Sequence, residues 1–142
     1  MATLPICKTT IACAQGLVNV YMTKLTEVMV QPLPDDGQGM LGRAAVSMLS
    51  TLLSDKDAVA IGPGWGRGMD LSAVIQAILA QTHAPAVIDA DGIIALSKLP
   101  DYRRKLPAGT ILTPHPGEMA RLTSIDLAEI IRNPIKHCRD LA

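Results

Sequence analysis

The stretch GPGWGRG, at residues 62–68, places a glycine at every second position. It follows an uninterrupted apolar run at residues 58–62, which is typical of a strand covered on both faces. Glycine lets the backbone pass close to a ligand, so such a turn can direct N–H groups at an anion. Its spacing matches neither the G-x-G-x-x-G of dinucleotide-binding domains nor a P-loop. With Arg67 inside it, the turn favours an anionic or polyhydroxylated ligand; the alternative is a tight turn that binds nothing.

Asp89 and Asp91 follow a second apolar run, AVI at residues 86–88. They are two positions apart, so an extended backbone would direct both side chains to one face. One hypothesis is a polar site, in which the two carboxylates hold a magnesium ion indirectly or bind a polar group of a ligand. The alternative is structural: Asp91 caps the helix that follows, and Asp89 accepts hydrogen bonds from nearby backbone N–H groups.

His115 lies between Pro114 and Pro116 in the stretch TPHPGE, which ends a third apolar run. The two prolines stiffen its backbone, and Gly117 permits an unusual turn. No second His or Cys occurs at ligand spacing. We therefore interpret His115 as a positioned hydrogen-bond donor and not as a metal ligand.

Glu118 is expected in the first turn of the helix after TPHPGE, where a negative charge is favourable. Arg121 comes one turn later and is close enough in sequence to pair with Glu118. The pair would face the same site as His115, or it would be a purely structural ion pair. The sequence is compatible with both.

The remaining histidines and the cysteines show no catalytic pattern. His83 and His137 are expected to be ordinary solvated residues of helices. The cysteines, Cys7, Cys13 and Cys138, are odd in number and lack a C-x-x-C pair, which argues against a disulfide framework and a structural zinc site. We interpret them as buried or inert, and this use of cysteine favours a reducing cytoplasm.

The elements that position these residues alternate between strand and helix patterns. Strands are predicted at residues 16–22, 27–31, 58–62, 86–89 and 110–114, and helices at residues 43–54, 71–79, 92–98 and, in two pieces around Pro134, after residue 126; residues 1–15 have no clear period. This order predicts an α/β fold with a parallel sheet of at least four strands. Ligands bind beyond the carboxyl ends of such strands, so the three turns should cluster at one end of the sheet.

Composition narrows the classes of function. A chain of 142 residues, 49% of them hydrophobic, fits a single soluble domain over residues 1–142. Its 13 basic and 13 acidic residues leave no net field to attract nucleic acid or an anionic membrane. One Trp, two Tyr and no Phe provide few surfaces on which bases could stack. Because no apolar run reaches the roughly 18 residues of a membrane span, we expect a small-molecule ligand and neither nucleic acid nor membrane.

Three segments, AIGPGWGRG, VIDADGIIAL and ILTPHPGEMARL, occur in this order. Together they resemble the NAD(P)H-hydrate dehydratase family, whose members carry G-P-G-x-G, D-A-D and T-P-H-P-G-E segments. CAQGLVNV also resembles the family's A-G-A-G-L-V segment, from which Cys13 and Gln15 depart. The resemblance implies a ribokinase-like three-layer α/β fold with a mainly parallel sheet. The fold would be incomplete in this chain, which corresponds to the central half of the family domain.

The resemblance also implies an activity: ADP-dependent, or in some members ATP-dependent, dehydration of hydrated NADH or NADPH, with magnesium assisting. Members of the family phosphorylate the hydroxyl of the hydrate and then expel phosphate. Carried over by position, the residues that line the hydrate site are Gly64 and Gly66 on one side and His115, Pro116, Gly117, Glu118, Met119, Ala120 and Arg121 on the other.

The family's nucleotide pocket and catalytic aspartate lie in a later K-G segment and a G-G-x-G-D segment. Neither segment follows TPHPGE in these 142 residues. The G-G-x-G-D element supplies the helix N-terminus and the base for phosphoryl transfer, so we expect no turnover by this chain alone. Half of a domain leaves sheet edges and apolar faces uncovered, so a homo-oligomer or a complementing chain is expected.

Two other functions are compatible with the sequence. A small-molecule kinase of the same superfamily would share the fold, because fold does not fix substrate; the TPHPGE segment favours the dehydratase. A non-catalytic binding or assembly module would keep the sheet and its turns but act through a partner chain.

Overall fold

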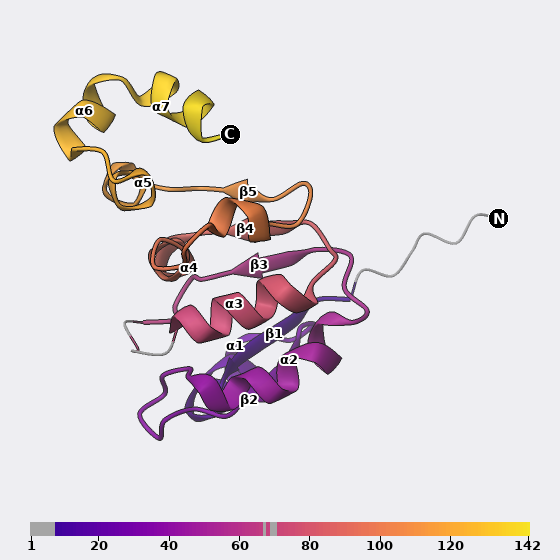
Figure 1. Ribbon diagram of the computed structural model, residues 1–142. Helices are drawn as coiled ribbons and strands as arrows, with labels where there is room; N and C mark the ends of the chain where they lie inside the picture. Colours follow the sequence, from indigo (N-terminus) through magenta and orange to yellow (C-terminus); the bar gives the residue numbers. More distant parts are fainter. Residues whose placement is uncertain (1–7, 67, 69–70) are drawn as a thin grey trace.

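The computed structural model describes residues 8–66, 68 and 71–142, and it has a mixed α/β architecture (Figure 1). The strands are β1 (Thr10–Ala14), β2 (Met29–Leu33), β3 (Val59–Ile61), β4 (Ala86–Ile88) and β5 (Ile111–Leu112). The helices are α1 (Val18–Lys24), α2 (Val46–Leu53), α3 (Leu71–Gln81), α4 (Ala90–Leu96), α5 (Pro116–Thr123), α6 (Leu127–Arg132) and α7 (Pro134–Leu141). Short 3-10 helices occupy Gln15–Leu17, Arg43–Ala45 and Tyr102–Lys105. The predicted fold class is confirmed.

The strands form two parallel sheets, one of order β1-β2 and one of order β3-β4-β5. In the second sheet Ile61 pairs with Ile88, and Ile88 pairs with Leu112. The expected single sheet of at least four strands is therefore wrong for the described residues. The β1-β2 ladder runs over five residue pairs, from Thr10–Met29 to Ala14–Leu33, and makes no hydrogen-bonded pairing with β3 in the part of the chain that the structure describes.

The predicted strand at residues 16–22 is also wrong, because this segment forms a 3-10 turn and α1. The true strand, β1, lies just before it, in the stretch that has no clear period. Two adjacent parallel strands cannot be joined by a tight hairpin, so the chain between β1 and β2 must cross over, and a helix does this. This tertiary requirement overrides the β-propensity of the apolar run GLVNVYM.

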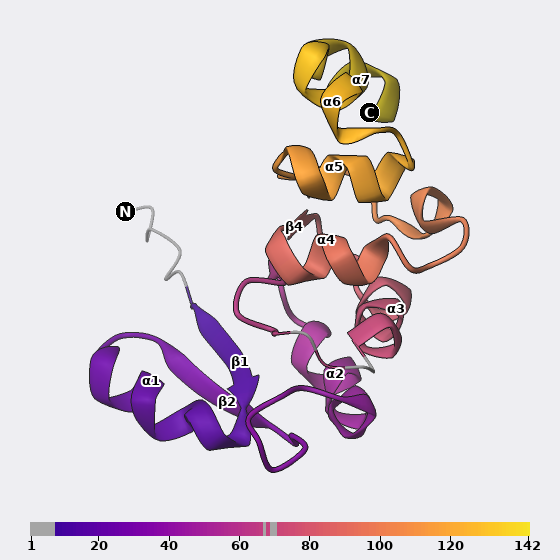
Figure 2. The same ribbon diagram turned by 90° about the vertical axis from the view of Figure 1, so that its left-hand side faces the viewer.

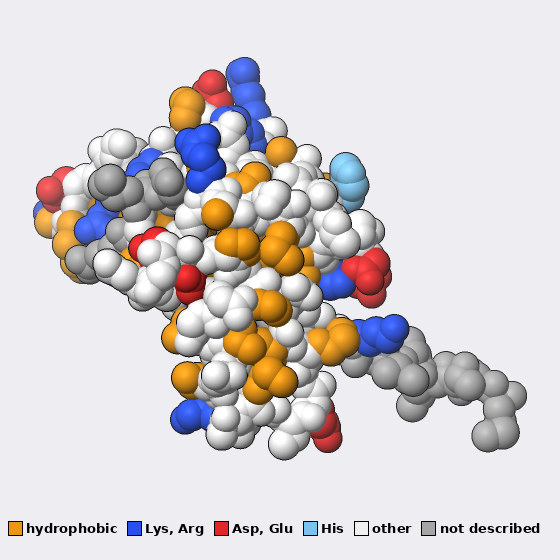
Figure 3. Space-filling model, turned by 90° about the horizontal axis from the view of Figure 1, so that it is seen from below, with side chains coloured by type: hydrophobic (Ala, Val, Ile, Leu, Met, Phe, Trp, Pro, Cys, Tyr) orange, Lys and Arg blue, Asp and Glu red, His pale blue; other side chains and the backbone are white. Residues whose placement is uncertain are grey.

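The β2 strand begins two residues later than predicted and continues through Pro32. A proline has no N–H to donate to a ladder, so it is tolerated in a strand that lies at the edge of its sheet. β2 is such an edge in the sheet of order β1-β2. Seen from below, the molecule carries a group of hydrophobic side chains on its surface (Figure 3). The exposed large hydrophobic residues of α1 and β2 include Val20, Met22 and Met29.

Helices α2, α3, α4 and α5 pack in a row along one side of the strands, whereas α1 lies on the other side of the β1-β2 sheet (Figure 2). The apolar positions predicted for α3 all face inward: Leu71, Val74, Ile75, Ile78 and Leu79 are buried. They pack with Ile61 and Ile88 of the sheet, which are 2% and 0% exposed. The helical period of 3.6 residues therefore located the core of this layer.

The other face of the β3-β4-β5 sheet presents a row of exposed apolar residues. Ala60 pairs with Val87, and Val87 pairs with Ile111. Val87 is 40% exposed and Ile111 is 57% exposed, and no described helix covers them (Figure 2). Parallel sheets in α/β proteins are covered on both faces. This row is thus an apolar surface in the position where such folds carry a second layer.

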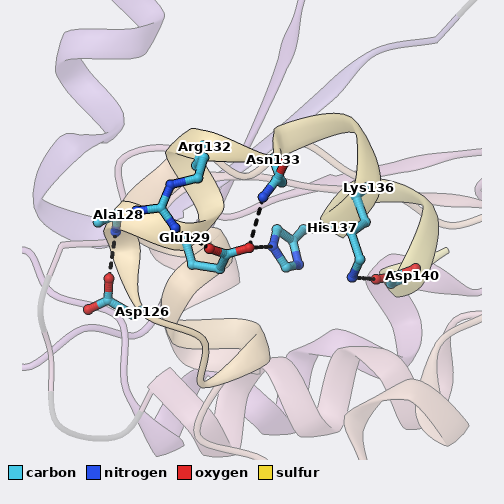
Figure 4. Close-up of polar contacts among 8 residues, drawn as sticks. All are labelled: Asp126, Ala128, Glu129, Arg132, Asn133, Lys136, His137 and Asp140. Carbon is cyan, nitrogen blue, oxygen red and sulfur yellow. Dashed lines mark hydrogen bonds and ion pairs between the residues drawn. The ribbon is translucent and has the colours of Figure 1, made fainter.

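The C-terminal segment forms the two helical pieces that were predicted, with Pro134 at the first turn of α7. The expectation that His137 is solvated is wrong, because this residue is only 5% exposed. Its Nε2 lies 3.5 Å from a carboxylate oxygen of Glu129 on α6 (Figure 4). Hydrogen bonding by Asn133 at 2.9 Å and the nearby His137 hold the pKa of Glu129 below its usual range. The cause of the burial is that α7 folds back against α6, which a sequence pattern does not reveal.

Candidate functional site

Three turns begin side by side at the carboxyl ends of β3, β4 and β5. The Asp89 N–H donates to the carbonyl oxygen of Ile61 at 3.0 Å, and the Thr113 N–H donates to the carbonyl oxygen of Ile88 at 3.2 Å. These bonds extend the parallel register beyond the strands and hold the turns together. The predicted clustering of GPGWGRG, DADG and TPHPGE at one end of the sheet is confirmed for the described residues. Arg67 lies outside them.

The first two turns are interlocked through glycines. Gly62 has a φ of +114°, and a Cβ atom placed on it would lie 2.1 Å from the carbonyl oxygen of Asp89. A Cβ atom on Gly92 would lie 2.9 Å from the Cα of Gly62. No side chain fits between the end of β3 and the first turn of α4. Both glycines are therefore required by packing, whatever ligand the turns bind.

Asp91 joins the same two turns through its side chain. Its Oδ2 accepts a hydrogen bond from the backbone N–H of Gly66 at 2.9 Å. The expectation that Asp91 caps α4 is wrong, because the helix begins at Ala90 and its N-cap is Asp89. Ala90 has a φ of +47°, an unusual value for a residue with a side chain. The backbone thus turns sharply between the two aspartates and places Asp91 inside the helix, facing the glycine-rich turn.

A shallow hollow of about 170 Å³ lies where the three segments meet. Gly66 from the first, Asp91 from the second and Arg121 of α5 all line it. The other lining residues are Gly68, Leu71, Ile94, Ala95 and Lys98. Lys98 was not predicted as a site residue, because it belongs to no motif. It reaches the hollow through the packing of α3, α4 and α5. Gly64 is not among the lining residues; it lies in the same turn with a φ of +76°.

His115 is the N-cap of α5, and its side chain is 67% exposed. Its Nδ1 accepts a hydrogen bond from the Gly117 N–H at 3.0 Å, which places the ring proton of the neutral imidazole on Nε2. Nε2 lies 3.1 Å from Oε1 of Glu118. The Glu118 Oε2 accepts from the backbone N–H of His115 at 3.0 Å. His115 is therefore the fixed N-cap of α5, with its imidazole against Glu118. Its role as a donor to a ligand stays a prediction.

Glu118 is buried, with 5% exposure, and its carboxylate oxygens lie against the backbone N–H and the imidazole of His115. The predicted pairing with Arg121 is absent from the ion pairs between described residues, so that expectation is wrong. The capping geometry explains this: a carboxylate three residues after the N-cap folds back to the cap N–H. Arg121 is exposed and faces the hollow instead.

The other residues expected on this side of the site divide by burial. Pro116 occupies the first turn of α5 and is exposed, Gly117 and Ala120 are half-buried, and Met119 is buried with 4% exposure. Met119 packs inside the protein and is not presented to the surface. Of the predicted run from His115 to Arg121, only Arg121 lines the hollow.

The described residues contain no group of three or more His, Cys, Asp or Glu side chains that could hold a metal ion. Within the same residues Cys13 is buried, and burial raises the pKa of its thiol, so the unreactive protonated form dominates at neutral pH. Cys138 is exposed, and Cys7 lies outside the described residues. No helix in the described part of the chain has the length and apolar character needed to span a membrane.

Three turns that follow parallel strands and open into helices stand at the carboxyl edge of the β3-β4-β5 sheet, which is the edge where open α/β sheets bind ligands. Comparison with known proteins identifies the family. The family model for NAD(P)H-hydrate dehydratase matches residues 4–142, and the chain belongs to this family. The two parallel sheets and their helices are consistent with the ribokinase-like fold that this membership implies.

Curated relatives of this chain are described as NAD(P)H-hydrate repair enzymes. The bifunctional NAD(P)H-hydrate repair enzyme of Moorella thermoacetica is 36% identical over 121 residues, which cover 85% of this chain and 23% of the relative. The enzyme of the same description from Thermofilum pendens is 26% identical over 132 residues, or 93% of this chain and 25% of the relative. That from Thermanaerovibrio acidaminovorans is 36% identical over 80% of this chain. The chain spans about a quarter of the length of these relatives.

Proposed function

We propose that this chain carries the hydrate-binding part of an ADP-dependent or ATP-dependent dehydratase that restores NADH and NADPH from their hydrated forms. One observation carries the proposal: Gly66, Asp91 and Arg121, which come from the three segments, line a single hollow. Residues from three segments that were singled out separately in the sequence line this hollow, the third through Arg121 of α5. The family membership supports hydrated NAD(P)H as the substrate.

The hydrated nicotinamide portion would lie between the glycine-rich turn and the start of α5. Gly64 and Gly66 allow close backbone approach on one side, and the exposed ring of His115 stands at the start of α5. The cationic groups of Arg121 and Lys98 border the hollow, and positive charge suits the phosphates of a dinucleotide. Pro116, Gly117, Glu118, Met119 and Ala120 would shape this side of the site by fixing the first turn of α5.

The proposed reaction has two steps. The hydroxyl oxygen of the hydrate attacks the terminal phosphorus of the nucleotide, and its proton passes to a base. The terminal phosphoanhydride bond breaks, so that ADP leaves as AMP, or ATP leaves as ADP. The carbon–oxygen bond then breaks, phosphate leaves, and loss of a proton from the neighbouring carbon restores the ring double bond. The base is expected in the G-G-x-G-D segment, which these 142 residues do not contain. The described residues would bind and orient the hydrate, and the base for phosphoryl transfer would come from that segment.

Magnesium does not fit these residues as a resident ion. They offer no cluster of three ligating side chains in the described part of the chain, and Asp91 already accepts from Gly66. Mg²⁺ keeps several waters and commonly binds through the phosphates of its substrate. We therefore assign no magnesium ligand among Asp89, Asp91 and Glu118, and the ion would arrive with the nucleotide.

We also propose that the chain works with another polypeptide, either a second copy or a complementing chain, in the reducing cytoplasm. The uncovered row of Ala60, Val87 and Ile111 supports the first part, because exposed apolar faces tend to pair. The free thiols Cys13 and Cys138 support the second.

A dehydration assay tests the proposal. The chain is incubated with hydrated NADH, ADP or ATP and magnesium, alone and with the remainder of the family domain supplied as a second polypeptide, and NADH is quantified. NADH should appear only in the combined sample, above the level that the second polypeptide gives by itself. Phosphorylation of another small alcohol, with none of the hydrate, would indicate the kinase alternative. If the combined sample shows neither activity and the chain does not bind the hydrate, the result favours the non-catalytic module.

A further inference from the structure

The glycine-rich turn has one side-chain anchor among the described residues, and it comes from a different segment. The Gly66 N–H donates to Oδ2 of Asp91 at 2.9 Å across 25 positions of sequence. Within the turn itself, the Trp65 N–H donates to the carbonyl oxygen of Gly62 at 3.2 Å. Gly64 and Gly66 both have positive φ, at +76° and +75°.

This arrangement makes the turn dependent on its anchor. Glycine loses more conformational freedom on folding than any other residue, so a turn with several glycines does not hold one conformation by itself. Asp91, in contrast, belongs to α4, whose Ile93 and Leu96 are fully buried. A hydrogen bond from a backbone N–H to a carboxylate is among the stronger ones in proteins. The buried helix therefore holds the turn in place at Gly66.

We propose that Asp91 is a positioning residue, which holds the glycine-rich turn in the conformation that presents Gly64 and Gly66 to the hydrated dinucleotide. It controls affinity through the turn and not through a contact of its own charge with the ligand. The ligand part of this inference rests on the proposed function, whereas the anchoring of the turn does not.

Asp89 provides a matched control within the same D-A-D segment. It carries the same charge at the same end of β4, and it is the N-cap of α4. In the described structure its side chain makes no capping hydrogen bond. Asp89→Ala thus removes a carboxylate from the same segment and leaves the anchor in place, whereas Asp91→Ala removes a carboxylate and the anchor. Asp91→Asn removes the charge and keeps an oxygen that can accept from Gly66.

The experiment uses the full chain and these three variants, with unchanged far-UV circular dichroism as the test of folding. Two readouts need no ligand: amide hydrogen exchange of Gly66 by NMR, and fluorescence emission of Trp65, the only tryptophan. Asp91→Ala should speed Gly66 exchange about tenfold, the size expected for one hydrogen bond to a charged group, and should shift Trp65 emission. Asp91→Asn should restore most of the protection, and Asp89→Ala should match the wild type.

Titration with hydrated NADPH gives the third readout. Asp91→Ala should weaken binding by a factor similar to the gain in Gly66 exchange, and Asp91→Asn should bind nearly as the wild type does. Unchanged Gly66 exchange and Trp65 emission in Asp91→Ala would overturn the anchoring role. Lost binding in Asp91→Asn with Gly66 still protected would overturn it too, because the charge would then act directly on the ligand. If Asp91→Ala speeds Gly66 exchange but the wild-type chain binds no hydrate, the anchoring role is supported and the proposed function is refuted.

Discussion

Gly62 and Gly92 approach so closely that a Cβ atom on Gly92 would meet the Cα of Gly62 at 2.9 Å. The backbones of two segments that lie 30 positions apart in the sequence, from Gly62 to Gly92, are thus in contact. The contact lies at the first residue of the glycine-rich turn. It makes a stability prediction that is independent of any ligand.

Gly62→Ala should destabilise the chain by at least about 3 kcal/mol, because the new methyl meets backbone atoms and the φ is left-handed. Gly64→Ala is the matched control: its φ is also positive, but a Cβ there has no described atom within 4 Å. The control should cost only about 1 kcal/mol. Denaturant midpoints measure both variants. Equal losses would show that strain in φ, and not the contact, decides the choice of glycine.

The chain is predicted to bind hydrated NADPH weakly through Gly64, Gly66 and His115, with a Kd of about 1 mM, or roughly 4 kcal/mol of binding free energy. NMR shifts should be confined to the three turns, and ADP should not bind. His115→Ala should abolish binding and cost about 1 kcal/mol through loss of the N-cap. His115→Asn keeps a cap for the Gly117 N–H but removes the imidazole, so it should remain stable and still not bind. Binding by the Asn variant would reduce His115 to a capping residue, and tight ADP binding would mean that the nucleotide site is wrongly assigned.

The uncovered sheet face should drive association. Val87→Lys and Ile111→Lys each place a charge in the exposed row, so each should lower the fraction of oligomer seen by light scattering or sedimentation at a given concentration. Gln76→Lys adds the same charge at an exposed position of α3, on the helical side of the sheet, and should leave association unchanged. A wild-type chain that stays monomeric at high concentration without a partner would contradict this prediction.

Acid should weaken the turn that follows β2. Hydrogen bonds from the Gly16 and Gly37 N–H groups, each 2.9 Å long, hold the pKa of Asp35 below its usual range. A folded-state pKa below the unfolded one contributes stability above about pH 4, and this contribution is lost as the pH falls through the folded value. Asp35→Asn should therefore reduce stability at neutral pH and flatten its decline below about pH 4. Urea midpoints measured against pH check this, and an unchanged slope in the variant would refute it.

Local patterns in the sequence predicted the layers well where one period dominated. The inward positions of α3 and the start of α7 at Pro134 follow from helical spacing and from the missing N–H of proline. The clustering of the three turns follows from parallel strand order alone, because carboxyl ends of parallel strands share one edge. These features need no knowledge of distant contacts.

The errors arose where a contact distant in sequence determined the outcome. GLVNVYM reads as a strand, yet the parallel pairing of β1 with β2 requires a crossover there. Asp91 reads as a helix cap, yet its partner is Gly66 on another turn. His137 reads as solvated, yet α7 places it beside Glu129. Lys98 belongs to no motif, and the packing of α3, α4 and α5 brings it to the hollow.

The all-parallel pairing also has a consequence for how the chain folds. In the β3-β4-β5 sheet a strand can pair with the next one only after the connecting segment has crossed over: Val59 pairs with Ala86, and Val87 pairs with Ile111. Long-range pairings of this kind are slow to form and leave apolar edges exposed in the meantime. During synthesis β3 emerges before either later strand, so its apolar run stays unpaired until residue 88 has left the ribosome. Refolding yield should therefore fall steeply as the concentration of the chain rises.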